Sequence, residues 1–222
     1  METNEQNYIL NSIKGVNKRE NQDNVLVIEE KLYNLYAIFD GVGSASNSRQ
    51  GTELVKTYIE KYYNKFINHD SVMIDELMYS CNKYFLETGI RDAFTTYCVV
   101  VLPKEDSKKM FYSTMGDTRI YIITNQYIEQ ISKDDHYGDF KNIITKCLGM
   151  DYLTHDDFVQ YHAEKKDGYL LMCTDGFYSF LENDKMKFFE FFNKKLLKAI
   201  QDNVNKAIDN KNFDDSTYVF VR

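Results

Sequence analysis

The chain has 222 residues, of which 43% are hydrophobic and 27% are charged, a balance typical of soluble globular proteins and too apolar for a disordered chain. Its formal net charge is -7 and no dense basic block occurs, so we expect no nucleic acid partner. The longest apolar stretch is only strand-sized, which predicts no membrane segment.

The two ends and the cysteines add further expectations. The N-terminus lacks the basic and apolar regions of a signal peptide, so we expect a cytoplasmic protein. The four cysteines are scattered without paired spacing, which favours small core residues over a zinc site. The length suits a single domain over residues 1–222.

The first half of the chain predicts a hairpin followed by two helices. Residues 24–30 and 33–39 are rich in β-branched and aromatic side chains and are separated by a short polar turn. Residues 48–66 and 71–87 then carry apolar side chains at helical spacing. The second strand of the hairpin ends at Asp40.

The second half is dominated by strands. The expected strands are residues 94–102, 110–115, 120–124, 127–131, 158–163 and 169–173. Residues 134–157 are expected to be irregular apart from the apolar piece 143–148, residues 183–208 are expected to be helical, and residues 216–221 form a closing strand. Because strands and helices rarely alternate, the order predicts an α+β fold with mostly antiparallel sheet.

Four aspartates stand in separate short motifs: Asp40 in FDGVG, Asp117 in MGDTR, Asp175 in CTDGF and Asp214 in FDDST. Three of them lie where an apolar run begins or ends. Carboxylates at the ends of buried strands are held rigidly, and several that meet at one sheet edge make an oxygen-rich site for Mg2+ or Mn2+. This pattern predicts a metal-dependent phosphate-ester hydrolase.

Six motifs occur in an order that resembles the PPM-type, or type 2C, metal-dependent serine/threonine protein phosphatases. They are KRENQD (18–23), FDGVGS (39–44), MGDTR (115–119), ITKCLG (144–149), LMCTDGF (171–177) and DDSTYV (214–219). The resemblance extends from Lys14 to Val221 and is to a minimal catalytic domain of the bacterial kind. It implies a four-layer αββα sandwich of two mostly antiparallel sheets flanked by helix pairs.

The resemblance also implies a metal centre. Asp40 would bridge two Mn2+ or Mg2+ ions, the carbonyl of Gly41 would complete the second ion, and Asp175 with Asp214 would hold the first. Asp117, with Asp175, would offer a weaker third site. A hydroxide that bridges the two ions would then hydrolyse phosphoserine or phosphothreonine.

Three further residues are implied to take part in catalysis. Lys18 stands where the family has a phosphate-binding arginine, and Arg19 follows it, so either side chain could bind the phosphate. Asp23 would hydrogen-bond metal-bound water instead of holding a metal itself. The expected partner is a phosphorylated protein, such as a cognate serine/threonine kinase or its targets.

Departures from the family pattern leave other functions open. Lys18, Gln22 and Ser179 differ from the residues usual at their positions. They motivate a regulatory pseudophosphatase that binds a phosphoprotein or kinase without turnover. A phosphatase acting on small phosphorylated metabolites is a third reading.

Two positions also have alternative interpretations. A slip of one residue would make Asp215 the metal ligand in place of Asp214. Asp117 could pair with Arg119 instead of contacting a metal.

Overall fold

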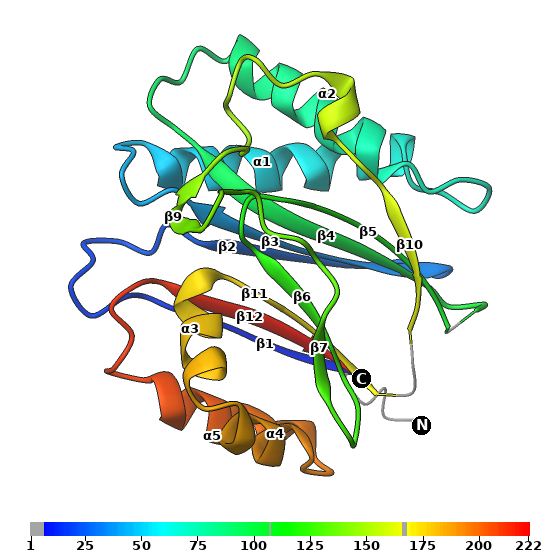
Figure 1. Cartoon of the computed structure of the whole chain (residues 1–222). Helices are drawn as coiled ribbons and strands as arrows, with labels where there is room; N and C mark the ends of the chain where they lie inside the picture. The colour runs from blue at the N-terminus through cyan, green and yellow to red at the C-terminus, as the bar shows by residue number, and fades with distance from the viewer. Residues whose placement is uncertain (1–6, 107, 166–167) are drawn as a thin grey trace.

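The computed structural model describes residues 7–106, 108–165 and 168–222. These residues form two antiparallel sheets that lie face to face between two layers of helices (Figure 1). The α+β sandwich expected from the sequence is therefore confirmed.

The first sheet, called sheet A here, has the strand order β1-β12-β11-β6-β7. Its strands are β1 (Tyr8–Ile13), β6 (Arg119–Ile123), β7 (Ile128–Gln130), β11 (Tyr169–Cys173) and β12 (Ser216–Val221). Every pairing in it is antiparallel, and β12, at the end of the chain, lies between β1 and β11. The two ends of the chain thus share one sheet.

The second sheet, sheet B, has the order β10-β5-β4-β3-β2. Its strands are β2 (Asn24–Glu29), β3 (Tyr33–Gly41), β4 (Thr95–Pro103), β5 (Lys109–Met115) and β10 (Tyr161–Glu164). The expected hairpin is confirmed, since β2 and β3 pair antiparallel from Asn24 with Phe39 to Glu29 with Asn34. A separate small hairpin joins β8 (His136–Tyr137) to β9 (Phe140–Ile144).

Helices cover the outer face of each sheet (Figure 1). The helices α1 (Ser48–Tyr62) and α2 (Ile74–Glu87) lie over sheet B, and α3 (Asp175–Asn183), α4 (Lys185–Phe192) and α5 (Leu197–Ile208) lie over sheet A. Short 3-10 turns occur at η1 (Tyr63–Lys65) and η2 (His155–Asp157). Within the described ranges, no helix has the length and apolar character required to cross a bilayer.

The four layers enclose three hydrophobic cores, and β3 shows how the sequence builds them. Its residues are apolar on both faces because alternate side chains of a strand point in opposite directions. Leu35 and Phe39 belong to the core beneath α1 and α2. Tyr36 and Ile38 belong to the core between the sheets. A strand buried on both faces holds its last residues rigidly, and Asp40 is one of them.

Some elements differ from the sequence prediction. Strand β1 was not predicted, and the stretch 134–157 contains the β8–β9 hairpin. The helical stretch expected at 183–208 is broken between α4 and α5, and α3 precedes it, so three helices cover sheet A where a pair was expected. Asp-Gly pairs are common in turns, but Thr174 is extended and α3 begins at Asp175.

Candidate active site

The five residues predicted to hold metal ions lie together in the structure. Asp40 and Gly41 end β3, Asp117 lies between β5 and β6, Asp175 begins α3, and Asp214 lies shortly before β12. All five line one cavity of about 730 Å3. Residues that are up to 174 positions apart in the sequence (214 − 40) therefore face a shared space.

Two glycines allow the backbone to place these carboxylates. A Cβ atom on Gly176 would lie 2.1 Å from the backbone oxygen of Asp215, so only glycine lets α3 start against the segment that leads into β12. Gly116 has a φ of +89, which disfavours other residues, and a Cβ atom there would lie 2.4 Å from a neighbouring threonine side chain. Asp175 and Asp117 each neighbour one of these glycines.

The electrostatics of the cavity show that the carboxyl groups are crowded. Burial raises the pKa of Asp40 well above its usual range, and the charges of Asp23, Asp175, Asp117 and Asp214 raise it further. Burial, followed by the charge of Asp175, raises the pKa of Asp117 to about 7. Burial and the charge of Asp214 also raise the pKa of Asp175, although a hydrogen bond with Asp40 opposes this. Bound cations would relieve this repulsion.

The chemistry of the donors fits hard divalent cations. Carboxylates and one backbone carbonyl offer only oxygen, which Mg2+ and Mn2+ prefer over softer metals. Among the residues that the structure describes, no three acidic, histidine or cysteine side chains lie in an arrangement that could hold an ion by themselves. The carboxylates thus share an open cavity, an arrangement suited to ions that keep several of their own waters.

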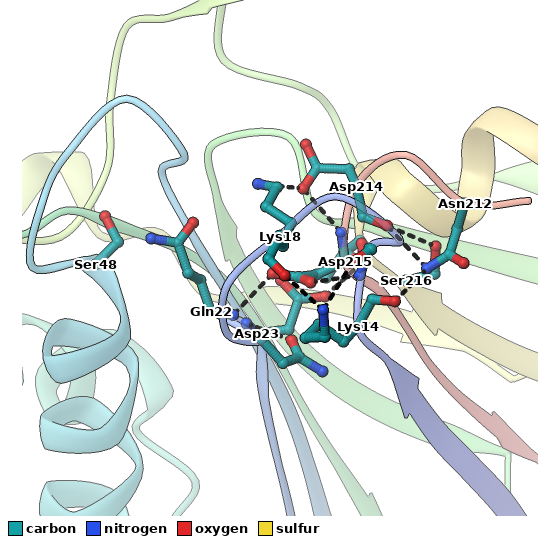
Figure 2. Close-up of polar contacts among 12 residues, drawn as sticks. Lys14, Lys18, Gln22, Asp23, Ser48, Asn212, Asp214, Asp215 and Ser216 are labelled. Carbon is teal, nitrogen blue, oxygen red and sulfur yellow. Dashed lines mark hydrogen bonds and ion pairs between the residues drawn. The ribbon is translucent and has the colours of Figure 1, made fainter. Parts of the chain in front are cut away.

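Lys18, and not Arg19, faces the carboxylates. Figure 2 shows its side chain extended to Asp214, with Nζ 2.6 Å from Oδ1. Burial lowers the pKa of Lys18, but the hydrogen bond with Asp214 and the charges of Asp214, Asp215 and Asp40 outweigh this, so the pKa is raised. Arg19 is exposed and forms no ion pair with the described part of the chain.

Asp215 has a structural role that separates it from Asp214. It is buried, and its two carboxylate oxygens accept hydrogen bonds from the backbone N–H groups of Gly15 and Gln22, each at 2.8 Å. These bonds fasten the loop between β1 and β2 over the approach to β12 (Figure 2). Asp214 lines the cavity and Asp215 does not, which favours the predicted ligand over the alternative register.

Asp23 lies buried beside the cavity but does not line it. Its Oδ2 accepts hydrogen bonds from the hydroxyl groups of Thr174 at 3.0 Å and Thr217 at 2.7 Å. Burial raises its pKa to about 7, even though both hydroxyl groups oppose the rise. Since two threonines already hold this carboxyl group, its place suits a supporting residue better than a direct ligand.

The alternative interpretation, in which Asp117 forms an ion pair with Arg119, is wrong. Arg119 pairs with Asp134, with Nη2 2.6 Å from Oδ2, and its guanidinium carbon lies 3.6 Å from the ring centroid of Tyr178. The hydroxyl of Tyr178 donates to Asp117 at 3.4 Å. The sequence reading missed Tyr178, although its place three residues after Asp175 on one helix predicts a neighbouring position.

A comparison with protein families decides the class of the protein. A sequence model described as protein phosphatase 2C matches residues 15–210. The chain belongs to the protein phosphatase 2C family. Members are phosphoprotein phosphatases, which hydrolyse phosphoric monoesters and depend on Mn2+ or Mg2+, and the family resemblance inferred from the six motifs is confirmed. No curated protein matches the sequence.

Solved structures of protein phosphatase 2C relatives share the fold. A variant of a bacterial serine phosphatase matches with a TM-score of 0.80 and 18% identity over 96% of both chains. Stp1 from Staphylococcus aureus matches with a TM-score of 0.77 and 18% identity over 96% of this chain and 93% of that one. The catalytic domain of PstP, in complex with two manganese ions, matches with a TM-score of 0.75 and 17% identity over 96% of both.

Proposed function

We propose that this protein phosphatase 2C enzyme removes phosphate from phosphoserine and phosphothreonine in proteins, with two divalent ions in the cavity. The observation that carries the proposal is the convergence of Asp40, Asp175 and Asp214 on one cavity, with Gly41 and Asp117 beside them. The two manganese ions in the PstP complex support the count of two.

The residues of the cavity divide the work of hydrolysis. When bound, the two ions would supply an activated water and neutralise charge on the phosphoryl oxygens. Asp40, Asp175 and Asp214 would hold the ions. The ammonium group of Lys18 would bind the phosphate as a point charge, whereas an arginine could form two parallel hydrogen bonds with it. In the hydrolysis, the water oxygen would bond to phosphorus while the bond from phosphorus to the serine or threonine oxygen breaks, and the proton that the water loses would end on that departing oxygen.

The proposed partners follow from this substrate class. The enzyme would act on a phosphorylated protein, such as a serine/threonine kinase or one of its targets, in the cytoplasm. Asp23 would hydrogen-bond metal-bound water through Oδ1, because both of its threonine partners bond to Oδ2. The pseudophosphatase alternative gains no support, because none of the predicted ligand positions is lost from the cavity.

Hydrolysis of p-nitrophenyl phosphate and of a phosphothreonine peptide tests the proposal. Turnover should require Mn2+ or Mg2+, stop with a chelator, and fall at least about 100-fold in Asp40→Asn. Asp151→Asn removes an exposed carboxylate outside the cavity and serves as the control. Undiminished turnover in Asp40→Asn would contradict the mechanism, and calorimetric Mn2+ binding without any turnover would favour the pseudophosphatase.

A further inference from the structure

The catalytic cavity continues well past the carboxylates. Its volume of about 730 Å3 is in the range of sites that hold ligands much larger than a phosphoryl group. We give the name side arm to the part of its wall formed by Tyr121, Ile128, Gln130, Ile144, Tyr178 and Glu182. These residues come from β6, β7, β9 and α3, so the side arm lies between the helices over sheet A and the β8–β9 hairpin.

The polar side chains of the side arm already have hydrogen-bond or ion-pair partners. The hydroxyl of Tyr121 donates to Glu182 at 3.1 Å, and Glu182 also pairs with Lys185 at 2.8 Å. The side-chain amide of Gln130 donates to a backbone carbonyl and to the carboxylate of Asp134. A polar ligand would have to compete with these bonds, whereas an apolar ligand would leave them intact.

An exposed aromatic pair lies on the same hairpin as Ile144, one of the apolar lining residues of the side arm. Tyr137 pairs with Phe140 and His136 pairs with Ile144, so Phe140 and Ile144 occupy successive paired positions of β9 beside β8. Phe140 is 60% exposed and stacks on Tyr137, which is 64% exposed, with ring centroids 6.4 Å apart. Ile143 is 46% exposed and does not line the cavity. An aromatic pair thus stands on the same hairpin as a wall of the catalytic cavity.

We infer that the side arm and the Tyr137–Phe140 pair bind an apolar side chain of the substrate, close in sequence to the phosphorylated residue. The inference rests on the proposed function, because a polypeptide whose phosphoryl group reaches Asp40 must leave the cavity through its mouth. The occupant is therefore the substrate chain itself. Ile144 is a specificity-determining residue, and it takes no part in the chemistry.

Phosphothreonine peptides test this inference. Each peptide carries leucine or alanine at one position within three residues of the phosphothreonine, and kcat/KM is measured with Mn2+. Burial of one apolar side chain should favour leucine over alanine by about tenfold or more at one position or several. Ile144→Thr keeps a β-branched residue and should reduce that preference. Ile143→Thr makes the same change at the exposed neighbour that does not line the cavity, and it should preserve the preference.

Turnover of p-nitrophenyl phosphate distinguishes a failure of the proposed side-arm contact from a failure of the proposed function. This substrate has no flanking residue, so its turnover in both variants shows that the catalytic centre is intact, and the leucine-to-alanine ratio of kcat/KM is then compared within each variant. Phe140→Ala changes an exposed side chain and provides a second variant that should reduce the leucine preference. Equal kcat/KM for leucine and alanine at every position, or equal loss in Ile143→Thr and Ile144→Thr, would overturn the inference. If the unaltered enzyme hydrolyses neither substrate, the proposed function fails as well.

Discussion

The metal-free protein should become more stable when Asp117 is replaced by asparagine. Burial, followed by the charge of Asp175, raises the pKa of Asp117 from 3.8 to about 7. A carboxyl group with a raised folded pKa gives stability that is fully present below pH 3.8 and is lost as the pH rises through about 7. Above neutral pH, ionised Asp117 therefore opposes folding, and asparagine removes the charge.

The size of the effect follows from the two pKa values. The difference between about 7 and 3.8 is roughly 3 units, and one unit corresponds to about 1.4 kcal/mol, so about 4 kcal/mol is the upper limit. Asparagine keeps an oxygen that can accept the hydrogen bond from Tyr178. Since about 1 kcal/mol shifts the Tm of a domain of this size by roughly 2–4 °C, we expect a rise of several degrees.

Thermal unfolding in a chelator at pH 8 and pH 5 measures this effect. The gain in Tm should be large at pH 8 and clearly smaller at pH 5, where folded Asp117 is mostly protonated. Asp151→Asn should leave Tm nearly unchanged at both values. No gain at pH 8, or the same gain at pH 5, would refute the view that Asp117 is a crowded, buried carboxylate.

Other predictions follow from the same geometry. Lys18→Met should raise KM for p-nitrophenyl phosphate about tenfold, because a charge-assisted contact with the phosphate is lost. Arg19→Met should leave the kinetics unchanged. Equal effects of the two changes would contradict the assignment of Lys18. Asp215→Ala should lower the free energy of unfolding, measured in urea, by about 1–3 kcal/mol, because two buried backbone N–H groups lose their acceptor. Asp214→Ala should mainly weaken Mn2+ binding in calorimetry. The reverse pattern would favour Asp215 as the metal ligand. Gly176→Ala should destabilise the protein by about 2 kcal/mol or more in the same urea assay, because its Cβ has no space; a neutral result would mean that α3 can shift.

The residues expected to hold metal could be named because the aspartates stand in short motifs at the ends of apolar runs, and the family resemblance of these motifs gave each residue its expected role. Asp40 ends a strand that is apolar on both faces, and Asp175 follows another apolar run. Such runs predict buried strands, and their ends predict where a carboxylate is held. The fold class followed in the same way from the order of the runs.

Other features depend on contacts between distant parts of the chain. Asn11 and Ser12 interrupt the apolar pattern of β1, and its partner strand β12 lies about 200 residues away. No local pattern therefore predicts the pairing. The choice between Lys18 and Arg19 was open because it depends on how Asp215 anchors the loop. No short-range signal predicts which carboxylate will bind a given loop.

The arrangement around Arg119 has a similar cause. In the sequence, Arg119 lies two residues from Asp117, which suggested an ion pair. In the structure, Arg119 pairs with Asp134, and Tyr178 comes from α3 to stack on the guanidinium group. The helix that carries Tyr178 was not predicted, because the expected helical stretch began only at residue 183, so its contribution to the cavity was missed.

Anomalous diffraction from crystals soaked in Mn2+ tests the central claim most directly. We predict two manganese peaks in the cavity, both within coordinating distance of Asp40, with Asp175 and Asp214 bound to one of them. Manganese bound elsewhere, or a cavity that holds no ion beside Asp40 at saturating Mn2+, would contradict the claim that these carboxylates form a two-metal catalytic centre.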